Sequence, residues 1–218
     1  MIFANRGEAG LGLARRLERF ASRHDVIVLG VPRGGVPVAY EIASALHAPL
    51  DVLVLRKLGV PGHEELAFGA IALGGMRVLD RHIIQNIGIS PSEVDAITAK
   101  EHAELLRRES AYRGHLSPLA LGGKTVILVD DGVATGASLL AGIRAVRAFE
   151  PAKTVVAVPV APPETCERLA DEVDDLVCIA TPERFGAVGQ FYDDFSEVCD
   201  EEVIQLLTRH NRALAMMG

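Results

Sequence analysis

The sequence predicts an α/β protein in which helices flank a mostly parallel central β-sheet. Short runs rich in Val and Ile alternate with longer segments of helical period, an order typical of β-α-β units. Hydrophobic residues make up 49% of the chain, aromatic residues only 5%, and Trp is absent, which suits aliphatic strands beneath Ala- and Leu-rich helices. A length of 218 residues allows one sizeable core, so we expect a single domain over residues 1–218.

The first strand and its flanking helices are clear from local pattern. Apolar residues at helical spacing over 11–20 predict an amphipathic opening helix. The β-branched run 26–30 predicts a buried parallel strand. A loop over 31–35 then leads into a helix over 36–46, with Pro37 in the first turn, where its missing N–H costs little.

The middle of the chain has a weaker pattern. Residues 50–55 predict a second strand. The polar stretch 56–68, which contains Gly and Pro and shows no clean period, predicts a mobile loop. Two short apolar runs, 70–73 and 77–79, resemble a hairpin.

A long charged helix is expected next. Ser90 and Glu93 have the spacing of a capping box, and the helix that they begin should run over about 90–113. Because this added helix is densely polar, we expect it to lie over the surface or to pack in an oligomer contact.

The C-terminal half repeats the alternation of strands and helices. These elements are expected, in order, over residues 125–129, 136–149, 154–160, 164–173 and 176–180. Ligands of such sheets bind outside the carboxyl ends of the strands. Residues 181–197 depart from the alternation and are expected to form a small hood.

Charge and cysteine content restrict the class of partner. The net charge of -7 argues against a nucleic-acid binder, because contact with a phosphate backbone requires a basic face. Cys166, Cys178 and Cys199 are too widely spaced for a paired-thiol metal site and fit thiols in a reducing cytoplasm. No uncharged apolar run reaches the ~18 residues that span a bilayer, and no secretory signal opens the sequence. We expect a soluble cytoplasmic protein with no membrane and no nucleic acid as partner.

The strongest functional signal is the segment 126–138. An apolar strand ends at Asp130 and Asp131, and seven small or hydroxylated residues then lead into a helix. Backbone N–H groups and the hydroxyls of Thr135 and Ser138 can surround a phosphate there. The alternative, an ordinary turn with an acidic N-cap, accounts for one Asp only. A phosphate cradle beside two carboxylates requires a ligand that offers both a phosphate and either hydroxyl donors or a bound cation.

This segment resembles the phosphoribosyl pyrophosphate (PRPP) signature of the type I phosphoribosyltransferases, in which a strand, an acidic pair and a Thr-Gly-x-Ser/Thr loop follow in the same order. The resemblance implies the type I phosphoribosyltransferase fold with a hood and a flexible loop. It has Asp130 and Asp131 holding the ribose hydroxyls and shaping a Mg²⁺ site. It assigns the 5-phosphate to Gly132, Val133, Ala134, Thr135, Gly136, Ala137 and Ser138.

A second loop fits the same family. Arg33, Gly34 and Gly35 follow the first strand, where these enzymes bind pyrophosphate, and backbone N–H groups beside a guanidinium suit that anion. A glycine turn with a surface Arg is the alternative. Arg56 and Lys57 end the next strand and are expected to meet the leaving pyrophosphate, unless they are simply solvated.

The stretch 57–69 occupies the position of the family's flexible loop, which closes over the reacting centre and excludes water. On this resemblance Lys57 and Glu65 are the expected catalytic residues, with His63 and Glu64 as further candidates for proton transfer. The alternative is that these are solvated loop residues.

The acceptor is the least defined part of the expected reaction. The family builds its acceptor pocket from a variable hood, where Phe185, Phe191 and Tyr192 could stack on a flat ring or could fill the small lobe's core. Ala134 stands before the Thr-Gly pair, as in adenine enzymes, yet one residue does not assign a base. Nearly the whole chain also resembles an uncharacterised phosphoribosyltransferase-like family that stands alone or is fused to hydrolase domains.

The expected function is therefore transfer of a 5-phosphoribosyl group from PRPP to a nitrogenous acceptor, purine-like or other, with Mg²⁺ as cofactor and release of pyrophosphate. The alternative is a non-catalytic protein of the same fold that senses PRPP or a nucleotide. Arg33, Arg56 and Lys57 favour the enzyme, because a sensor need not bind a leaving group. We also expect a homodimer.

Overall fold

Five parallel strands form the central sheet of the computed structural model, which describes residues 3–72, 75–114 and 120–216. The spatial order is β2-β1-β6-β7-β8, and every neighbouring pair is parallel. The predicted α/β fold with a parallel central sheet is confirmed. The strands are β1 (Val26–Gly30), β2 (Leu50–Val52), β6 (Thr125–Val129), β7 (Lys153–Val160) and β8 (Asp175–Ala180).

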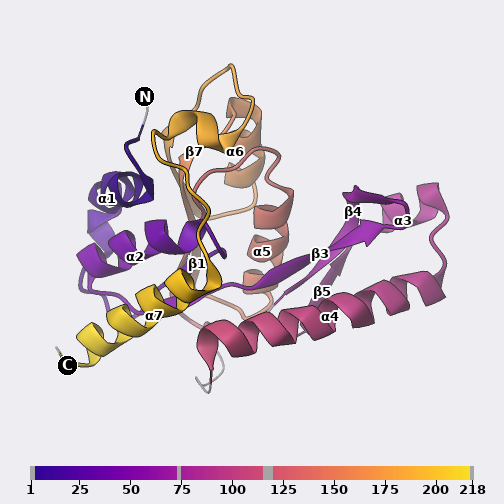
Figure 1. Ribbon diagram of the computed structural model, residues 1–218, viewed down its shortest axis with the longest axis horizontal. Helices are drawn as coiled ribbons and strands as arrows, with labels where there is room; N and C mark the ends of the chain where they lie inside the picture. Colours follow the sequence, from indigo (N-terminus) through magenta and orange to yellow (C-terminus); the bar gives the residue numbers. More distant parts are fainter. Residues whose placement is uncertain (1–2, 73–74, 115–119, 217–218) are drawn as a thin grey trace.

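Helices cover both faces of this sheet (Figure 1). Alternate residues of its strands point to opposite faces and pack into two separate cores. Val26 and Val28 of β1 pack into the larger core, whereas Ile27 and Leu29 pack into the smaller one. The larger core is covered by α1 (Arg6–Arg16), α2 (Gly35–Leu46) and α7 (Asp200–Ala215), the smaller by α5 (Ala137–Arg147) and α6 (Pro163–Ala170).

The opening helix lies earlier in the chain than its apolar pattern predicts. α1 begins at Arg6, where the Asn5 side chain accepts a hydrogen bond of 3.0 Å from the N–H of Glu8. The expected continuation to residue 20 is a separate 3₁₀ turn, η1 (Glu18–Phe20), which buries Phe20 in the larger core. A polar cap, and not the apolar spacing, therefore sets the start of the helix.

The stretch 56–68, predicted as a mobile loop, is most of a β-hairpin in a second, antiparallel sheet. A register irregularity between Leu58 and Val60 interrupts the pairing, which explains why the sequence shows no strand period there. Leu58, Val60 and Phe68 are buried in the larger core and anchor the hairpin. The sheet has the order β3-β4-β5, with β3 (Leu55–Val60), β4 (His63–Ala72) and β5 (Met76–Leu79).

The predicted hairpin between residues 70–73 and 77–79 corresponds to the pairing of β4 with β5, although Leu73 lies outside the described residues. Gly69 is required at this pairing, because a Cβ there would lie 2.4 Å from the carbonyl oxygen of Val78. Figure 1 shows the three strands projecting away from the central sheet.

The long charged helix is confirmed as α4 (Pro91–Arg113), which follows the short α3 (Arg81–Ile87). Its predicted capping box is present, since Ser90 and Glu93 exchange hydrogen bonds. α4 runs alongside the second sheet and meets α7 at its C-terminal end (Figure 1). The helix thus packs through a few buried residues while most of its length stays exposed.

The expected hood over 181–197 is an irregular segment with one 3₁₀ turn, η3 (Val188–Phe191). Phe3 and Tyr192 pair here in an isolated parallel bridge and form a small separate cluster.

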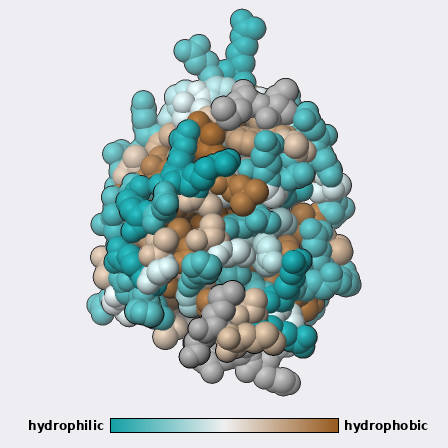
Figure 2. All heavy atoms as spheres, turned by 90° about the vertical axis from the view of Figure 1, so that its left-hand side faces the viewer, coloured by the Kyte–Doolittle hydropathy of each residue, from teal (hydrophilic) through white to brown (hydrophobic). Residues whose placement is uncertain are grey.

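On the face drawn in Figure 2 hydrophilic side chains dominate, with hydrophobic ones in small groups. Among the described residues no helix is both long and apolar enough to cross a membrane. The expected homodimer stays a prediction.

Candidate functional site

A cavity of about 720 Å³ opens at the carboxyl ends of β1 and β6. After β1 the chain continues to β2 on one side of β1, whereas after β6 it continues to β7 in the opposite direction. The gap between β1 and β6 is therefore a topological switch point. Loops diverge at such a point and leave a crevice, which is where open α/β sheets bind ligands. The cavity is lined by the loop after β1, the acidic pair after β6, strand β3 and one side of α4.

Asp130 and Asp131 form the floor of this cavity. The Nε of Arg6 donates to Oδ2 of Asp131 at 2.8 Å, and the hydroxyl of Tyr192 donates to the Asp131 carbonyl oxygen at 2.6 Å. Burial and the neighbouring Asp131 raise the pKa of Asp130 well above its usual range. Burial also raises the pKa of Asp131, although Arg6 opposes the shift. The pair is therefore poised to gain from a ligand that brings hydroxyl donors or a cation.

The glycine loop after β1 packs directly against the acidic pair. A Cβ at Gly34 would lie 1.9 Å from Oδ2 of Asp131, and one at Gly35 would lie 2.7 Å from the carbonyl oxygen of Val129. The loop turns through a cis peptide bond between Pro32 and Arg33. The predicted pyrophosphate loop and the predicted acidic pair are thus in contact, as a shared ligand would require.

The loop over residues 132–138 leads from the acidic pair into α5. Its N-cap is Gly136, with φ +74, which offers no side chain to the first N–H groups of the helix. Those N–H groups and the nearby Ser138, which lines the cavity, can therefore donate to an anion. Thr165 of α6 fixes the loop from behind, because its hydroxyl donates to the Ala134 carbonyl oxygen at 2.7 Å.

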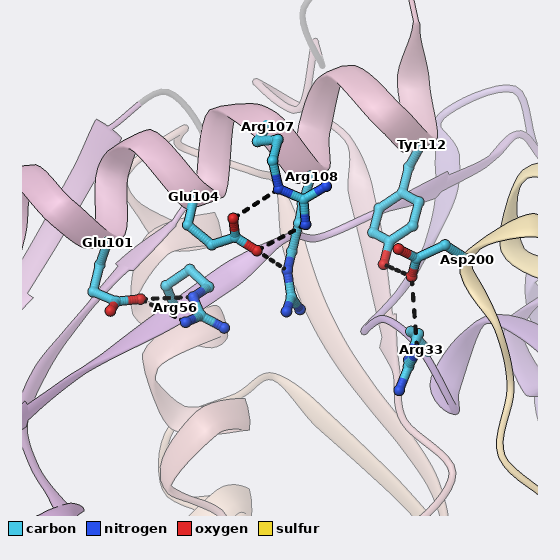
Figure 3. A network of polar contacts seen from close by, with 8 residues as sticks. All are labelled: Arg33, Arg56, Glu101, Glu104, Arg107, Arg108, Tyr112 and Asp200. Atoms are coloured by element: carbon cyan, nitrogen blue, oxygen red, sulfur yellow. Dashed lines mark hydrogen bonds and ion pairs between the residues drawn. The ribbon is translucent and has the colours of Figure 1, made fainter.

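Cationic side chains surround the cavity, and several are held by carboxylates (Figure 3). Arg33 pairs with Glu197 and lies 4.0 Å from Asp200. Arg56 of β3 pairs with Glu101 of α4 at 2.7 Å. The structure therefore brings the predicted Arg33, Arg56 and Lys57 into one cavity with the acidic pair, and it adds Lys100 and Arg108 from α4.

The contribution of α4 to the site and the ion pair of Arg6 with Asp131 were not predicted from the sequence. The cavity-lining residues of α4 follow a helical spacing of three, four and seven and therefore form a stripe on one face of the helix. These residues differ in type, so no local pattern in the sequence marks the stripe or its place in the cavity. They are Ile97, Lys100, Glu101, Arg108 and Tyr112.

The hood aromatics were expected either to stack on an acceptor or to fill the small lobe's core, and Tyr192 lies in that core. Tyr192 is 6% exposed and stacks on Phe195 at 5.0 Å between ring centroids, with Phe3 at 5.5 Å. Its ring thus fills the small lobe's core, and its hydroxyl donates to the carbonyl oxygen of Asp131; an acceptor-binding role of the hood stays a prediction. Phe185 and Phe191 contact each other at 5.2 Å and are not among the described residues that line the cavity.

The expected catalytic pair is only partly placed. Lys57 lies on β3 and lines the cavity. Glu65 belongs to β4, as do His63 and Glu64, but the side chains of Glu64 and Glu65 lie outside what the structure describes. The roles of Lys57 and Glu65 stay predictions.

Fold and site together define an α/β protein whose cavity joins an acidic pair, a glycine loop and the start of a helix. Residues 7–196 match the family model of the phosphoribosyl transferase domain. The chain belongs to this family, which confirms the resemblance found in the sequence.

Curated proteins and a solved structure are similar to this chain. Two curated proteins of Mycobacterium tuberculosis, from strains CDC 1551 and H37Rv, are each 45% identical over 217 residues and carry the provisional name phosphoribosyl transferase. The match covers 100% of this chain and 49% of each relative, so the chain spans about half the length of the curated relatives it matches. The crystal structure of the protein TT1426 of Thermus thermophilus is similar with a TM-score of 0.85 at 42% identity, over 96% of this chain and 99% of that one.

Proposed function

We propose that this protein is a phosphoribosyltransferase that binds PRPP and Mg²⁺ in the cavity and transfers the 5-phosphoribosyl group to a nitrogenous acceptor, with release of pyrophosphate. One observation carries the proposal: a single cavity joins the acidic pair, the start of α5 and the cationic glycine loop. Two anion sites on either side of a carboxylate pair match the order of phosphate, ribose and pyrophosphate along PRPP.

The ribose end of PRPP fits the β6 side of the cavity. The carboxylates of Asp130 and Asp131 accept hydrogen bonds from the ribose hydroxyls, while N–H groups at the start of α5 and the hydroxyl of Ser138 donate to the 5-phosphate. Arg6 and Tyr192 hold Asp131 in position for this role. The ribose is thereby fixed with its reacting carbon towards the glycine loop.

The pyrophosphate fits the β1 side. Backbone N–H groups of the glycine loop and the guanidinium of Arg33 bind it, and Arg56 and Lys57 meet it from β3. As the bond between C1 of the ribose and pyrophosphate breaks, negative charge gathers on the leaving group and positive charge on the ribose. The cations stabilise the first and the carboxylates the second, while a ring nitrogen of the acceptor forms the new bond to C1.

Mg²⁺ fits the donors present here. It binds through one or two carboxylates together with substrate phosphates and keeps several waters, and Asp130 and Asp131 would supply the carboxylates. The part of the chain that the structure describes holds no group of three or more His, Cys, Asp or Glu side chains that could bind a metal by itself. When bound with PRPP, Mg²⁺ would neutralise part of the charge of the pyrophosphate.

The ion pairs around the cavity must rearrange when an anion binds. Arg33 and Arg56 are each paired with a carboxylate, Glu197 and Glu101. Their partners are replaced by phosphate oxygens when PRPP enters, and the released glutamates become solvated. The guanidinium groups that PRPP needs are therefore already held at the cavity by glutamates. A more highly charged ligand can displace those glutamates.

The proposal is tested by calorimetric titration of PRPP with and without Mg²⁺, followed by an assay for pyrophosphate release with a panel of nitrogenous acceptors and mass spectrometry of the products. We expect Mg²⁺-dependent binding and a nucleotide product with at least one acceptor. Absence of PRPP binding at millimolar concentration would overturn the proposal. Binding without turnover for every acceptor would refute the transfer reaction and favour a sensor of PRPP.

A further inference from the structure

α4 forms the wall of the cavity that faces the acidic pair and the glycine loop. Its five cavity-lining residues, named above, fall on one face of the helix. Tyr112, at the C-terminal end of this face, is 4% exposed and donates its hydroxyl to Asp200 of α7 at 2.6 Å. Burial and this hydrogen bond raise the pKa of Tyr112 to about 12. The wall is therefore fixed to the body of the protein at this end.

Lys100, Arg107 and Arg108 against Glu101 and Glu104 leave this part of α4 with a net charge of +1. Glu104 accepts from both Arg107 and Arg108, at 2.8 and 2.9 Å (Figure 3), and these two guanidiniums lower the pKa of Glu104 to about 2. One carboxylate between two guanidiniums leaves one positive charge over, and the Arg108 side chain, 34% exposed against 60% for Arg107, is the one that lines the cavity. Lys100 adds a positive charge next to Glu101, which is paired with Arg56, and among the side chains that the structure describes no carboxylate forms an ion pair with Lys100.

On the function proposed above, PRPP has binding groups other than these two cations. The 5-phosphate has the start of α5, and the pyrophosphate has the glycine loop with Arg33, Arg56 and Lys57. The cavity volume of about 720 Å³ lies in the upper part of the range usual for ligand pockets, roughly 300–1,000 Å³. Room remains beside α4 for a second reactant.

We infer, resting on the proposed function, that the inner face of α4 binds the acceptor and that Lys100 and Arg108 select an acceptor that carries an anionic group on its nitrogen heterocycle. Ile97 supplies apolar contact to the ring, and the two cations bind its carboxylate or phosphate. The hood aromatics do not line this cavity in the described structure, so α4 takes the part of an acceptor wall.

The test uses matched probes that differ in charge: nicotinate against nicotinamide, orotate against uracil, and benzoate against benzamide. Each is titrated by ligand-observed NMR into the whole chain with Mg²⁺, ribose 5-phosphate and inorganic pyrophosphate present, so that both parts of the PRPP site are filled. We expect the acid of at least one heterocyclic pair to bind about 10-fold or more tightly than its neutral partner, as for hydrogen bonds to charged groups. Lys100→Met with Arg108→Met should remove this preference and change the ribose 5-phosphate affinity by less than about twofold.

Arg107→Met is the matched control, because Arg107 shares Glu104 with Arg108 but does not line the cavity. It should keep the preference for the acid. The single variants Lys100→Gln and Arg108→Gln, checked for an unchanged melting temperature, serve if the double variant unfolds.

Equal or absent binding of the acid and neutral members of every heterocyclic pair would overturn the inference. So would a loss of affinity for inorganic pyrophosphate in the double variant, because Lys100 and Arg108 would then belong to the pyrophosphate part of the PRPP site. Failure of the wild-type protein to bind ribose 5-phosphate or PRPP at all would instead count against the proposed function, so the two failures are distinguishable.

Discussion

Asp130 and Asp131 lie side by side at the end of β6, yet their surroundings differ. Asp131 has Arg6 as an ion-pair partner at 2.8 Å, whereas Asp130 accepts only the backbone N–H of Asp131 at 2.9 Å among the hydrogen bonds of the described residues. A buried carboxylate is costly unless it is paired. At the scale of single residues, burial of Asp130 thus lowers stability, whereas the ion pair with Arg6 offsets the cost of burying Asp131.

Asparagine substitutions separate these two members. Asp130→Asn should leave the free energy of unfolding unchanged or raise it, because it removes a buried charge beside another carboxylate. Asp131→Asn should lower that free energy by about 1–3 kcal/mol, because it leaves Arg6 without its partner. Both should abolish Mg²⁺-dependent PRPP binding. Urea denaturation and calorimetry measure the two effects, and a large destabilisation by Asp130→Asn would show that this carboxylate has a structural role.

Gly34 offers a second test at this scale. Gly34→Ala places a methyl group 1.9 Å from Oδ2 of Asp131, so either the glycine loop or the acidic pair must move. We expect at least a 10-fold loss of PRPP affinity, because a displaced site loses one or more charge-assisted hydrogen bonds of about 1.5–3 kcal/mol each.

Gly88→Ala is the control for this substitution. Gly88 has φ +78, so alanine is strained there, but no atom lies within 4 Å of the added methyl group. The control should cost about 1 kcal/mol of stability and leave PRPP affinity unchanged. A similar affinity for PRPP in both variants would contradict the proposed packing of the loop against the ligand.

At the scale of elements, the hairpin of β3 and β4 and the helix α4 complete a cavity that the central sheet only begins. β3 brings Arg56 and Lys57 to the cavity, and α4, which packs against β3, lines it with a face that includes Glu101. The pair between Arg56 and Glu101 joins the two elements. Movement of the hairpin relative to α4 would therefore change both the positions of Arg56 and Lys57 and the access of water to the cavity.

Lys57→Ala tests whether the hairpin acts on the reacting centre. Turnover should fall by about 100-fold or more while affinity for a product nucleotide changes little, because the lysine would act on the leaving group and the transition state. Arg77→Ala is the control, since Arg77 lies on β5 and pairs only with the exposed Asp95. Equal losses in turnover and product affinity for Lys57→Ala would reject a role confined to the transition state.

At the scale of the whole molecule, the C-terminal helix is tied to the N-terminal half through a buried histidine. His210 of α7 is 5% exposed and lies 2.8 Å from the carbonyl oxygen of Ala48 and 3.3 Å from the hydroxyl of Ser44 on α2. Burial lowers the pKa of His210 below its usual value of 6.5. The folded state therefore favours the neutral ring.

This linkage predicts a pH dependence of stability. In the window below about 6.5 the unfolded chain binds a proton at His210 that the folded protein does not, so the free energy of unfolding should fall as pH decreases, by up to about 1.4 kcal/mol per pH unit. His210→Gln should flatten this fall, whereas His24→Gln, at an exposed histidine, should not. Denaturation at pH 5 to 8 measures the slope, and parallel curves for wild type and His210→Gln would refute the link.

The sequence by itself determined the parallel sheet and the acidic pair with its loop. These are local signals: a buried strand is a short β-branched run, and a residue directly after that strand must lie at its carboxyl end. The glycine loop and Arg33 followed from the same rule. The contact between Gly34 and Asp131 follows from the sheet only, because the loops that contain them come after β1 and β6, which are neighbouring strands.

Only the tertiary structure decided how the rest of the cavity is built. The hairpin of β3 and β4 depends on pairing across an irregular register, which no local period reveals. The orientation of α4 depends on its packing against β3 and α7, so its sequence predicted a charged helix but not which face lines the cavity. Tyr192 likewise became a support for Asp131 through a contact 61 residues away. Such contacts arise from long-range packing, which fixes the relative position of elements that local sequence patterns define one at a time.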